Sequence, residues 1–220
     1  MGATPSGENW LPIEGAGLPL TGATQESDAL LLDLRSPAAF ASGFIPGSFH
    51  LPDPDCVELL RANGLVKGKQ IFVITETDEQ MAQYGKAVAS GLDLEFGGAW
   101  GPAGIEEWRK RYGDLGSLEV VAADTLAVRV SAWKTVVIDT RARAAFERAR
   151  IREALHIPAD TLTGSLTGLP AQTALCVVCE MGKRASFAAS VMWNLGYRNV
   201  SILRGGFAAY LDSHLPLARS

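Results

Sequence analysis

The 220-residue sequence has few cysteines, few histidines and no long apolar segment. Its three cysteines, Cys56, Cys176 and Cys179, do not make a disulfide framework, so a reducing, cytoplasmic setting is expected. Because the histidines and cysteines lack the spacing of metal ligands, we expect no metal site and no cofactor. No apolar run approaches the roughly 18 residues of a membrane helix, and the N-terminal residues do not resemble a signal peptide. The sequence therefore predicts no membrane partner.

An excess of positive charge is also lacking. Lys and Arg number 20 against 24 Asp and Glu, which gives a net charge of −4 and a pI near 5.4. Nucleic-acid-binding domains usually carry a basic patch or a high pI, so no nucleic-acid partner is expected. A composition that is 47% hydrophobic and 20% charged is typical of globular proteins. The length fits one large domain or two small ones.

The most informative segment surrounds Cys179. An apolar, β-branched run over residues 175–178 ends at this cysteine, a short loop containing Gly182 follows, and apolar side chains then recur with helical spacing. This order predicts a strand, a tight loop and a helix N-terminus, where successive backbone N–H groups can point at one anion. A thiolate at residue 179 would be that anion, and Lys183 and Arg184 would add positive charge nearby.

The chain also contains an internal repeat. Asp33 and Asp139 stand 106 positions apart, and so do His50 and His156. An arginine, an Ala-Ala-Phe segment, an isoleucine and a proline recur at the same offset. This similarity indicates two copies of one unit of about 100 residues, which is a normal domain size. We predict a first domain over residues 1–115 and a second over residues 116–220.

Each copy alternates short apolar runs with helical patterns. This alternation predicts an α/β fold in which a central parallel sheet is flanked by helices on both faces. In such sheets the active site lies beyond the carboxyl ends of the strands, which is where the pattern places Cys179. In the second copy the predicted strands lie within residues 118–121, 135–138, 154–156, 174–178 and 200–203, and helices are expected over residues 123–132 and 141–148.

The first copy lacks the cysteine. Thr75 stands at the position of Cys179, and the segment Glu76-Thr77-Asp78-Glu79-Gln80 replaces the loop. Three carboxylates there would repel a thiolate or an anionic donor. We therefore expect this domain to be catalytically silent, to pack against the second domain and to form one wall of its cleft.

Together these segments resemble the rhodanese family of sulfurtransferases in its tandem form. The resemblance implies two rhodanese-like domains, of which only the second carries a nucleophile. It implies that Cys179 takes a sulfane sulfur from a small-molecule donor such as thiosulfate, becomes a persulfide, and passes the sulfur to a thiol or to cyanide. The matching pieces are Asp139-Thr140-Arg141, residues 151–158, residues 179–184 and residues 203–207.

The resemblance makes Glu180, Met181, Gly182, Lys183 and Arg184 the substrate-binding loop. We expect its backbone N–H groups to stabilise the thiolate, the persulfide and the leaving anion without rearranging. Gly182 is expected to adopt a conformation that a Cβ would hinder. The Glu180 carboxylate is expected to point toward solvent, because it would be unfavourable inside an anion pocket.

Loop length and loop composition bear on the chemistry. Related phosphatases and arsenate reductases place five residues between Cys and Arg, whereas Cys179 and Arg184 enclose four, which favours sulfur transfer. Ala145, Glu180 and Met181 stand where donor-binding basic residues are common in the family, so a protein persulfide or a thiol persulfide is as plausible a donor as thiosulfate. The sequence also leaves open a persulfide carrier or partner-binding module, and a thiol–disulfide oxidoreductase that uses Cys176.

Several further residues receive a structural interpretation. Cys176 is expected in the core, because residues three apart in a strand point to opposite faces, and Cys56 is expected at a helix start or on the surface, without a role. Asp33, Arg35, Asp139 and Arg141 are expected to form ion-paired strand ends. His50 and His156 are expected to be structural, and core positions are expected for Trp100, Trp108, Trp133 and Trp193.

Overall fold

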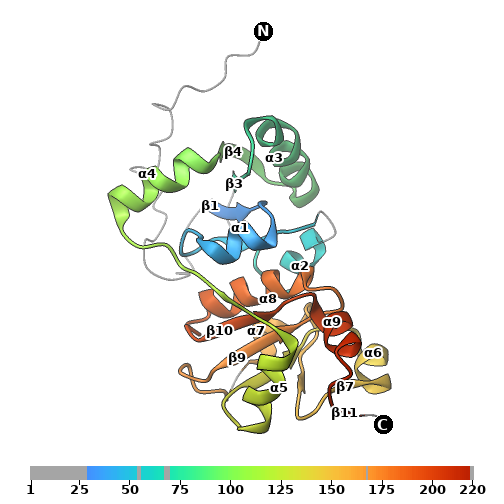
Figure 1. Ribbon diagram of the computed structural model, residues 1–220. Coiled ribbons are helices and arrows are strands. Elements are labelled where there is room, and N and C mark those ends of the chain that lie inside the picture. Colours follow the sequence, from blue (N-terminus) through green and yellow to red (C-terminus); the bar gives the residue numbers. More distant parts are fainter. Residues whose placement is uncertain (1–28, 54–55, 67–69, 167, 219–220) are drawn as a thin grey trace.

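Two α/β units are stacked on one another in the computed structural model (Figure 1). It describes residues 29–53, 56–66, 70–166 and 168–218, and the side chains of residues 78–84 lie outside this part. The predicted domain 1–115 therefore extends beyond the described residues at its start. Each unit contains one central parallel sheet with helices on both faces, as the sequence predicted.

The first unit has a four-stranded sheet in the order β2-β1-β3-β4, and all of its pairings are parallel. Its strands are β1 (Ala29–Asp33), β2 (Phe49–His50), β3 (Gln70–Ile74) and β4 (Glu95–Trp100). Its helices are α1 (Pro37–Ser42), α2 (Val57–Ala62), α3 (Asp78–Leu92) and α4 (Pro102–Tyr112).

The second unit has a five-stranded parallel sheet in the order β5-β10-β9-β6-β8. Its strands are β5 (Glu119–Val121), β6 (Val136–Asp139), β8 (Leu155–His156), β9 (Leu175–Val178) and β10 (Val200–Leu203). A separate antiparallel pair joins β7 (Arg150–Ile151) to β11 (Leu217–Ala218). The helices are α5 (Ala123–Ser131), α6 (Arg143–Arg148), α7 (Leu162–Ser165), α8 (Lys183–Asn194) and α9 (Gly206–Asp212).

Both faces of the second sheet are buried, which explains why its strands appear in the sequence as continuous apolar runs. In β9, Leu175 and Val177 face the core that the two units share, whereas Cys176 and Val178 face a second core beneath α5 and α9. The alternation follows from the two-residue period of a strand. Cys176 is therefore a core residue on the opposite face from its neighbours, as the sequence predicted.

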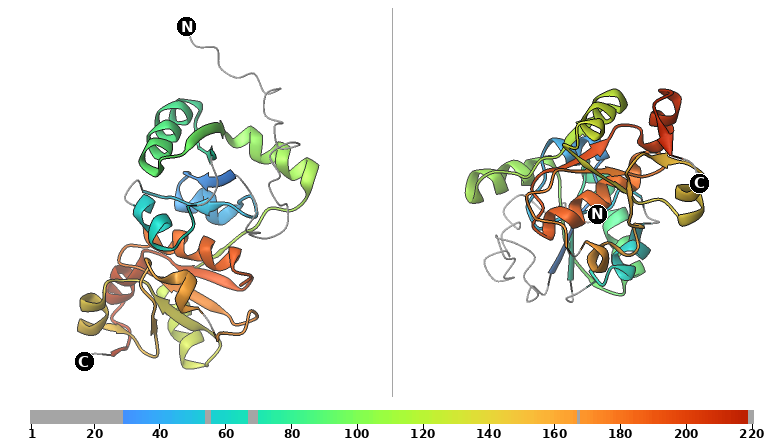
Figure 2. Two further views of the ribbon diagram at one scale, coloured as in Figure 1. Left: turned by 180° about the vertical axis from the view of Figure 1, so that it is seen from behind. Right: turned by 90° about the horizontal axis from the view of Figure 1, so that it is seen from below.

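Helix α8 lies at the junction of the two units (Figures 1 and 2). On one side it contacts β9 and β10 of its own sheet, and on the other it contacts α1 and β2 of the first unit. Every residue from 185 to 192 is consequently buried. A helix that is covered on several sides needs small or apolar residues all round, and this one supplies three alanines, two serines and Phe187 within that stretch.

Polar contacts fix the two units in one register. The Asn63 side chain donates to the Ala159 carbonyl at 2.8 Å, and Thr163 Oγ1 donates to the Asn63 carbonyl at 3.0 Å. At the C-terminal end of α8, the Asn194 side chain donates to the Ser48 carbonyl at 3.0 Å. The apolar core between them is continuous across both units, so the interface resembles a domain interior.

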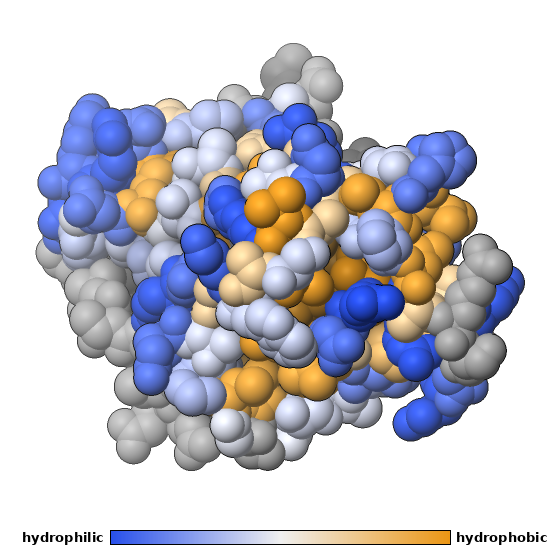
Figure 3. Space-filling view, turned by 60° about the horizontal axis from the view of Figure 1, so that its bottom comes forward, coloured by the Kyte–Doolittle hydropathy of each residue, from blue (hydrophilic) through white to orange (hydrophobic). Residues whose placement is uncertain are grey.

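On the surface, hydrophobic residues form separate groups between hydrophilic ones, as Figure 3 shows for one face. Trp133 is 82% exposed, so its predicted core position is wrong. Leu195, just beyond the end of α8, is also partly exposed. Within the described part of the chain, no helix combines the length and apolarity needed to cross a membrane. The exposed large hydrophobic residues are Val120, Val128, Trp133, Leu155, Met181, Leu195 and Leu211.

Candidate active site

Cys179 directly follows β9 and precedes α8, at the carboxyl edge of the sheet. Only 4% of the residue is exposed, and it lies in a pocket of about 410 Å³. The pocket brings together the end of β9, the segment that follows β6, and residues of the first unit. Its lining residues are Asp53, Cys56, Thr140, Arg141, Ala142, Ala145, Cys179, Glu180, Met181, Lys183 and Arg184.

Backbone N–H groups converge on the Cys179 sulfur. The Ala185 N–H donates to Sγ at 3.2 Å, and the nearby amides of Gly182, Met181 and Arg184 also favour the charged form of the sulfur. Arg184 and Ala185 belong to the first turn of α8, whose amides have no partner within the helix. The segment that follows Cys179 thus directs backbone N–H groups toward the sulfur, and the Ala185 N–H is a hydrogen-bond donor to it.

Burial and hydrogen bonding act on the Cys179 thiol in opposite directions. Burial raises the pKa of the thiol, the four backbone N–H groups lower it, and the net result lies above its ordinary value. The sequence suggested a thiol favoured as thiolate by Lys183 and Arg184. The net shift of the pKa is in the other direction, because both side chains are exposed to water and desolvation of the sulfur is the larger effect.

The N-terminus of α9 holds the loop in this conformation. The Phe207 N–H donates to the Cys179 carbonyl at 2.8 Å, and the Ala208 N–H donates to the Glu180 carbonyl at 3.0 Å. With these carbonyls bound on the outer side, the loop amides are left to point inward. Gly206 permits the close approach, since its φ is +67° and a Cβ there would lie 2.5 Å from the Cys179 carbonyl oxygen.

Gly182 adopts the left-handed conformation at the start of α8, with a φ of +84°. A residue with a Cβ is strained in this region. The expectation for this glycine is thus confirmed by its backbone geometry.

Arg141 is a fixed cation of the pocket wall. Its Nε and Nη2 donate to Asp139 at 3.0 and 2.8 Å, and Nη2 also donates to the Ala149 carbonyl at 2.7 Å. The guanidinium lies 3.6 Å from the centre of the Phe207 ring. The same bidentate pair joins Arg35 to Asp33 in the first unit. Both pairs are the ion-paired strand ends that the repeat predicted, but the pocket-lining position of Arg141 was not predicted.

Glu180 lies at the rim of the pocket. Its side chain is 64% exposed, as expected, and its Oε2 lies 3.6 Å from Arg141 Nη1. The rim therefore carries a carboxylate beside the buried cation. Lys183 and Arg184 line the same pocket with exposed side chains, so the charges around the sulfur are mixed.

The first unit contributes Asp53 and Cys56 to the pocket. Cys56 directly precedes α2, so the predicted position at a helix start is confirmed. The residue is buried and does not lie on the surface. Its counterpart 106 positions later is the buried core residue Leu162. The repeat therefore gave no signal that this position faces the cysteine of the other unit.

Thr75 takes the place of Cys179 in the first unit. It is buried, and its hydroxyl donates to the Thr77 carbonyl at 3.1 Å. Glu76, at the start of the segment that replaces the loop, accepts hydrogen bonds from the Ser36 backbone and hydroxyl. The side chains of Asp78, Glu79 and Gln80 lie outside the described residues.

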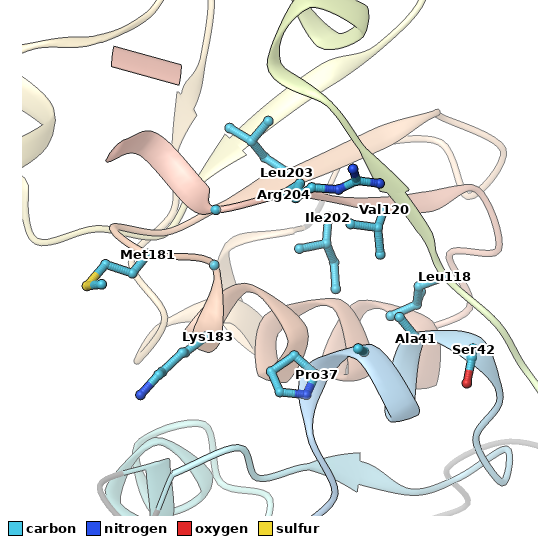
Figure 4. Close-up of a pocket in the computed structure, with 13 residues that line it drawn as sticks. Pro37, Ala41, Ser42, Leu118, Val120, Met181, Lys183, Ile202, Leu203 and Arg204 are labelled. Carbon is cyan, nitrogen blue, oxygen red and sulfur yellow. The ribbon is translucent and has the colours of Figure 1, made fainter. Parts of the chain in front are cut away.

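A second pocket, of about 530 Å³, adjoins the other side of the loop (Figure 4). Met181, Gly182 and Lys183 line it from the loop, and Ile202 lines it from β10. Helix α1 contributes Pro37, Ala38, Ala41 and Ser42. Figure 4 shows the apolar side chains of Ile202, Val120 and Leu118 between the sheet and α1. This pocket does not include Cys179 among its lining residues.

Cys176 offers a contrast within the same strand. Burial raises the pKa of its thiol to about 12, and all three cysteines lie outside disulfides. The described residues contain no group of three or more His, Cys, Asp or Glu that could hold a metal ion.

Similar proteins are found among curated sequences and among solved structures. A sulfurtransferase from Allochromatium vinosum is 26% identical over 98 residues, which cover 44% of this chain and 92% of that protein. Among solved structures, a thiosulfate sulfurtransferase from Pseudomonas aeruginosa has 20% identity and a TM-score of 0.42, and the match covers 87% of this chain and 40% of that one. A rhodanese-related protein from Thermoplasma volcanium has 20% identity and a TM-score of 0.43, with coverages of 46% and 99%.

The family match spans most of the chain. The rhodanese-like domain family matches twice, over residues 20–110 and 122–213. The first match contains the whole four-stranded sheet, and the second contains the five-stranded sheet except for its edge strand β5. The chain therefore belongs to the rhodanese family, as a tandem of two rhodanese-like domains.

Proposed function

We propose that this protein is a sulfurtransferase that carries sulfane sulfur as a persulfide on Cys179. The observation that carries the proposal is the hydrogen bond from the Ala185 N–H to the buried Cys179 sulfur, in a pocket where three further backbone N–H groups also favour its charged form. Fixed amides stabilise negative charge on sulfur in each state of the cycle, and they need no rearrangement when the charge moves. Family membership supports a sulfurtransferase-type function, without naming the donor or the acceptor.

The proposed cycle has two displacements. The Cys179 thiolate attacks the outer sulfur of the donor, a new S–S bond forms, and the donor's own S–S bond breaks with its electron pair on the departing group, which is sulfite when the donor is thiosulfate. A thiol or cyanide then attacks the outer sulfur, and the electron pair returns to Cys179 as thiolate. Two easier steps through a covalent intermediate replace one difficult displacement.

The mixed charges of the pocket affect which sulfur donor it can bind. Arg141, Lys183 and Arg184 attract an anion, whereas Glu180 and Asp53 in the same lining oppose a second negative charge. Glu180 also lies beside Arg141 and weakens its field at the rim. We infer that a thiol persulfide, with one negative charge at its reacting end, suits the pocket better than the thiosulfate dianion.

The test is sulfur transfer to cyanide from thiosulfate and, separately, from a thiol persulfide such as glutathione persulfide. Cys179→Ala is expected to abolish turnover with either donor. Cys176→Ala is the matched control, because it lies in the same strand on the opposite face and is expected to keep turnover. Activity that survives Cys179→Ala would overturn the proposal. Stable persulfide on Cys179 without turnover of either donor would indicate a carrier instead.

A further inference from the structure

His50 of the silent domain reaches the helix that carries the loop amides. Its ring Nδ1 lies 2.7 Å from Ser186 Oγ, and its backbone N–H donates to Ser190 Oγ at 3.0 Å. All three residues are fully buried, and the two serines stand one turn apart on α8. One residue of the first domain thus forms hydrogen bonds with the first two turns of this helix.

The direction of the ring hydrogen bonds follows from their partners. His50 Nε2 lies 2.8 Å from the Arg35 carbonyl, which can only accept, so Nε2 carries a hydrogen. Burial lowers the pKa of His50 to about 4, with Asp33 and Arg35 as the charged groups that act on it, so the ring is neutral at physiological pH. Nδ1 of this tautomer is an acceptor, and it needs a donor.

Ser186 supplies that donor. Its Oγ also lies 2.7 Å from the Lys183 carbonyl, but a hydroxyl has one hydrogen to donate. Lys183 is the first residue of α8, and its carbonyl is the normal acceptor for the helical N–H four residues later. The buried Nδ1 of His50 has no such alternative in the helix. The hydroxyl hydrogen is therefore assigned to His50.

The hydrogen-bonded serine stands next to the sulfur site. Ser186 follows Ala185, whose N–H donates to Cys179 Sγ at 3.2 Å. We propose that His50 is a positioning residue for the cysteine site: it holds Ser186, and through it the first turn of α8, so that the Ala185 N–H points at the sulfur. The inference rests on the proposed role of Cys179 as the nucleophile.

Comparison with the equivalent histidine of the second domain distinguishes the proposed positioning role of His50 from its structural role within its own domain. His156, the counterpart of His50, donates from Nε2 to the Arg141 carbonyl at 2.8 Å and stacks on Phe146, just as His50 stacks on Phe40. Both histidines therefore hold the strand ends of their own domains. The contact between His50 and Ser186 adds a link to the other domain.

The test measures how fast Cys179 is alkylated by iodoacetamide in the full chain, at one pH below the pKa and without a sulfur donor. Ser186→Ala and His50→Gln are expected to slow alkylation roughly threefold or more, which corresponds to about half a unit in the pKa of the thiol. His50→Asn is expected to retain most of the rate, because its Oδ1 replaces Nδ1 as the acceptor for Ser186.

Ser190→Ala is the matched control. Ser190 is equally buried and bonds the same histidine, but it lies one turn farther from the sulfur. It is expected to leave the alkylation rate unchanged, and thermal unfolding of each variant shows that the folded protein was assayed. An equal loss in Ser190→Ala, or no loss in Ser186→Ala, would overturn the inference. Because no sulfur is transferred in this assay, a failure of the proposed function would leave the alkylation rates unchanged.

Discussion

The reactivity of Cys179 depends on two opposing effects at a single atom. Desolvation raises the pKa of its thiol, and four backbone N–H groups limit that rise. At neutral pH the free protein therefore holds only a small thiolate fraction, below the roughly 3% of an unperturbed cysteine. In the proposed cycle the amides are most important after the sulfur has acquired its charge, during attack and in the persulfide state.

This balance predicts how the reactivity of the cysteine depends on pH. The alkylation rate of Cys179 is expected to keep rising through the ordinary thiol pKa, since the folded pKa lies above it. Cys176, whose pKa is raised to about 12 in the core, is expected to stay unmodified in the folded protein. Mass spectrometry of the separate cysteine peptides after short alkylation pulses between about pH 6 and pH 10 measures both. A plateau for Cys179 near neutral pH would show that its pKa is not raised.

The lowered pKa of His50 predicts that the stability of the folded protein depends on pH. Its pKa is about 4 when folded and 6.5 in an exposed chain, so the unfolded state binds more protons between these values. The free energy of unfolding is then unaffected by this group above pH 6.5 and falls by up to about 3 kcal/mol as the pH drops to about 4. Urea unfolding across this range, compared with His50→Asn, isolates the effect. Equal slopes in the two proteins would refute the buried neutral histidine.

At the scale of elements, the cysteine loop is held from two sides. The first turn of α8 provides amides to the sulfur, and the N-terminus of α9 binds the carbonyls of Cys179 and Glu180 from behind. A loop held in this way can keep its N–H groups pointing inward without help from a bound anion. The two adjacent glycines Gly205 and Gly206, both with positive φ, allow α9 to start at this distance.

This arrangement predicts a large effect for Gly206→Ala. The new Cβ would lie 2.5 Å from two backbone atoms and would need a left-handed conformation. We expect a loss of more than about 2 kcal/mol in the free energy of unfolding and at least a tenfold loss of sulfur transfer in the fraction that folds.

Gly91→Ala is the control for this change. Residue 91 lies in α3, where a Cβ would meet no atom within 4 Å. That substitution is expected to leave activity unchanged and to stabilise the protein by about 0.5–1 kcal/mol. Urea unfolding and the cyanide assay measure both variants. A Gly206→Ala protein with normal stability and turnover would contradict the proposed support from α9.

The sequence predicted most of these elements because their signals are local. Apolar runs ended where β9 and β10 end and one residue before the end of β6, and the left-handed glycine of the loop was predicted from its place between a strand and a helix. The short pair β7 and β11 was missed, since two residues in each strand show no periodicity. The support from α9 was missed as well, because hydrogen bonds between distant backbone groups leave no side-chain pattern.

At the scale of the whole molecule, the two domains share one apolar core, and α8 lies inside it. The sequence predicted that the first domain would pack against the second. It did not predict that His50 would reach α8 or that Asp53 and Cys56 would line the pocket. An apolar helix face looks the same in sequence whether it covers its own sheet or a neighbouring domain, so this contact could not be assigned.

The shared core predicts cooperative unfolding. Cys56 in the first domain and Cys176 in the second are both buried, so each reports the opening of its own domain. Pulse alkylation in increasing urea, read peptide by peptide, is expected to give coincident transitions for the two cysteines. Asn63→Ala, which removes polar bonds across the interface, is expected to shift both midpoints together. Two separate transitions would show that the domains are stable independently.

The most direct test of the proposed sulfur transfer is the mass of the Cys179 peptide after incubation with a sulfur donor and removal of excess donor. We expect this peptide to gain the mass of one sulfur atom, and we expect cyanide to remove the gain and yield thiocyanate. The peptides of Cys56 and Cys176 are expected to end the cycle unchanged. A Cys179 peptide that never gains sulfur, from thiosulfate or from a thiol persulfide, would contradict the persulfide mechanism.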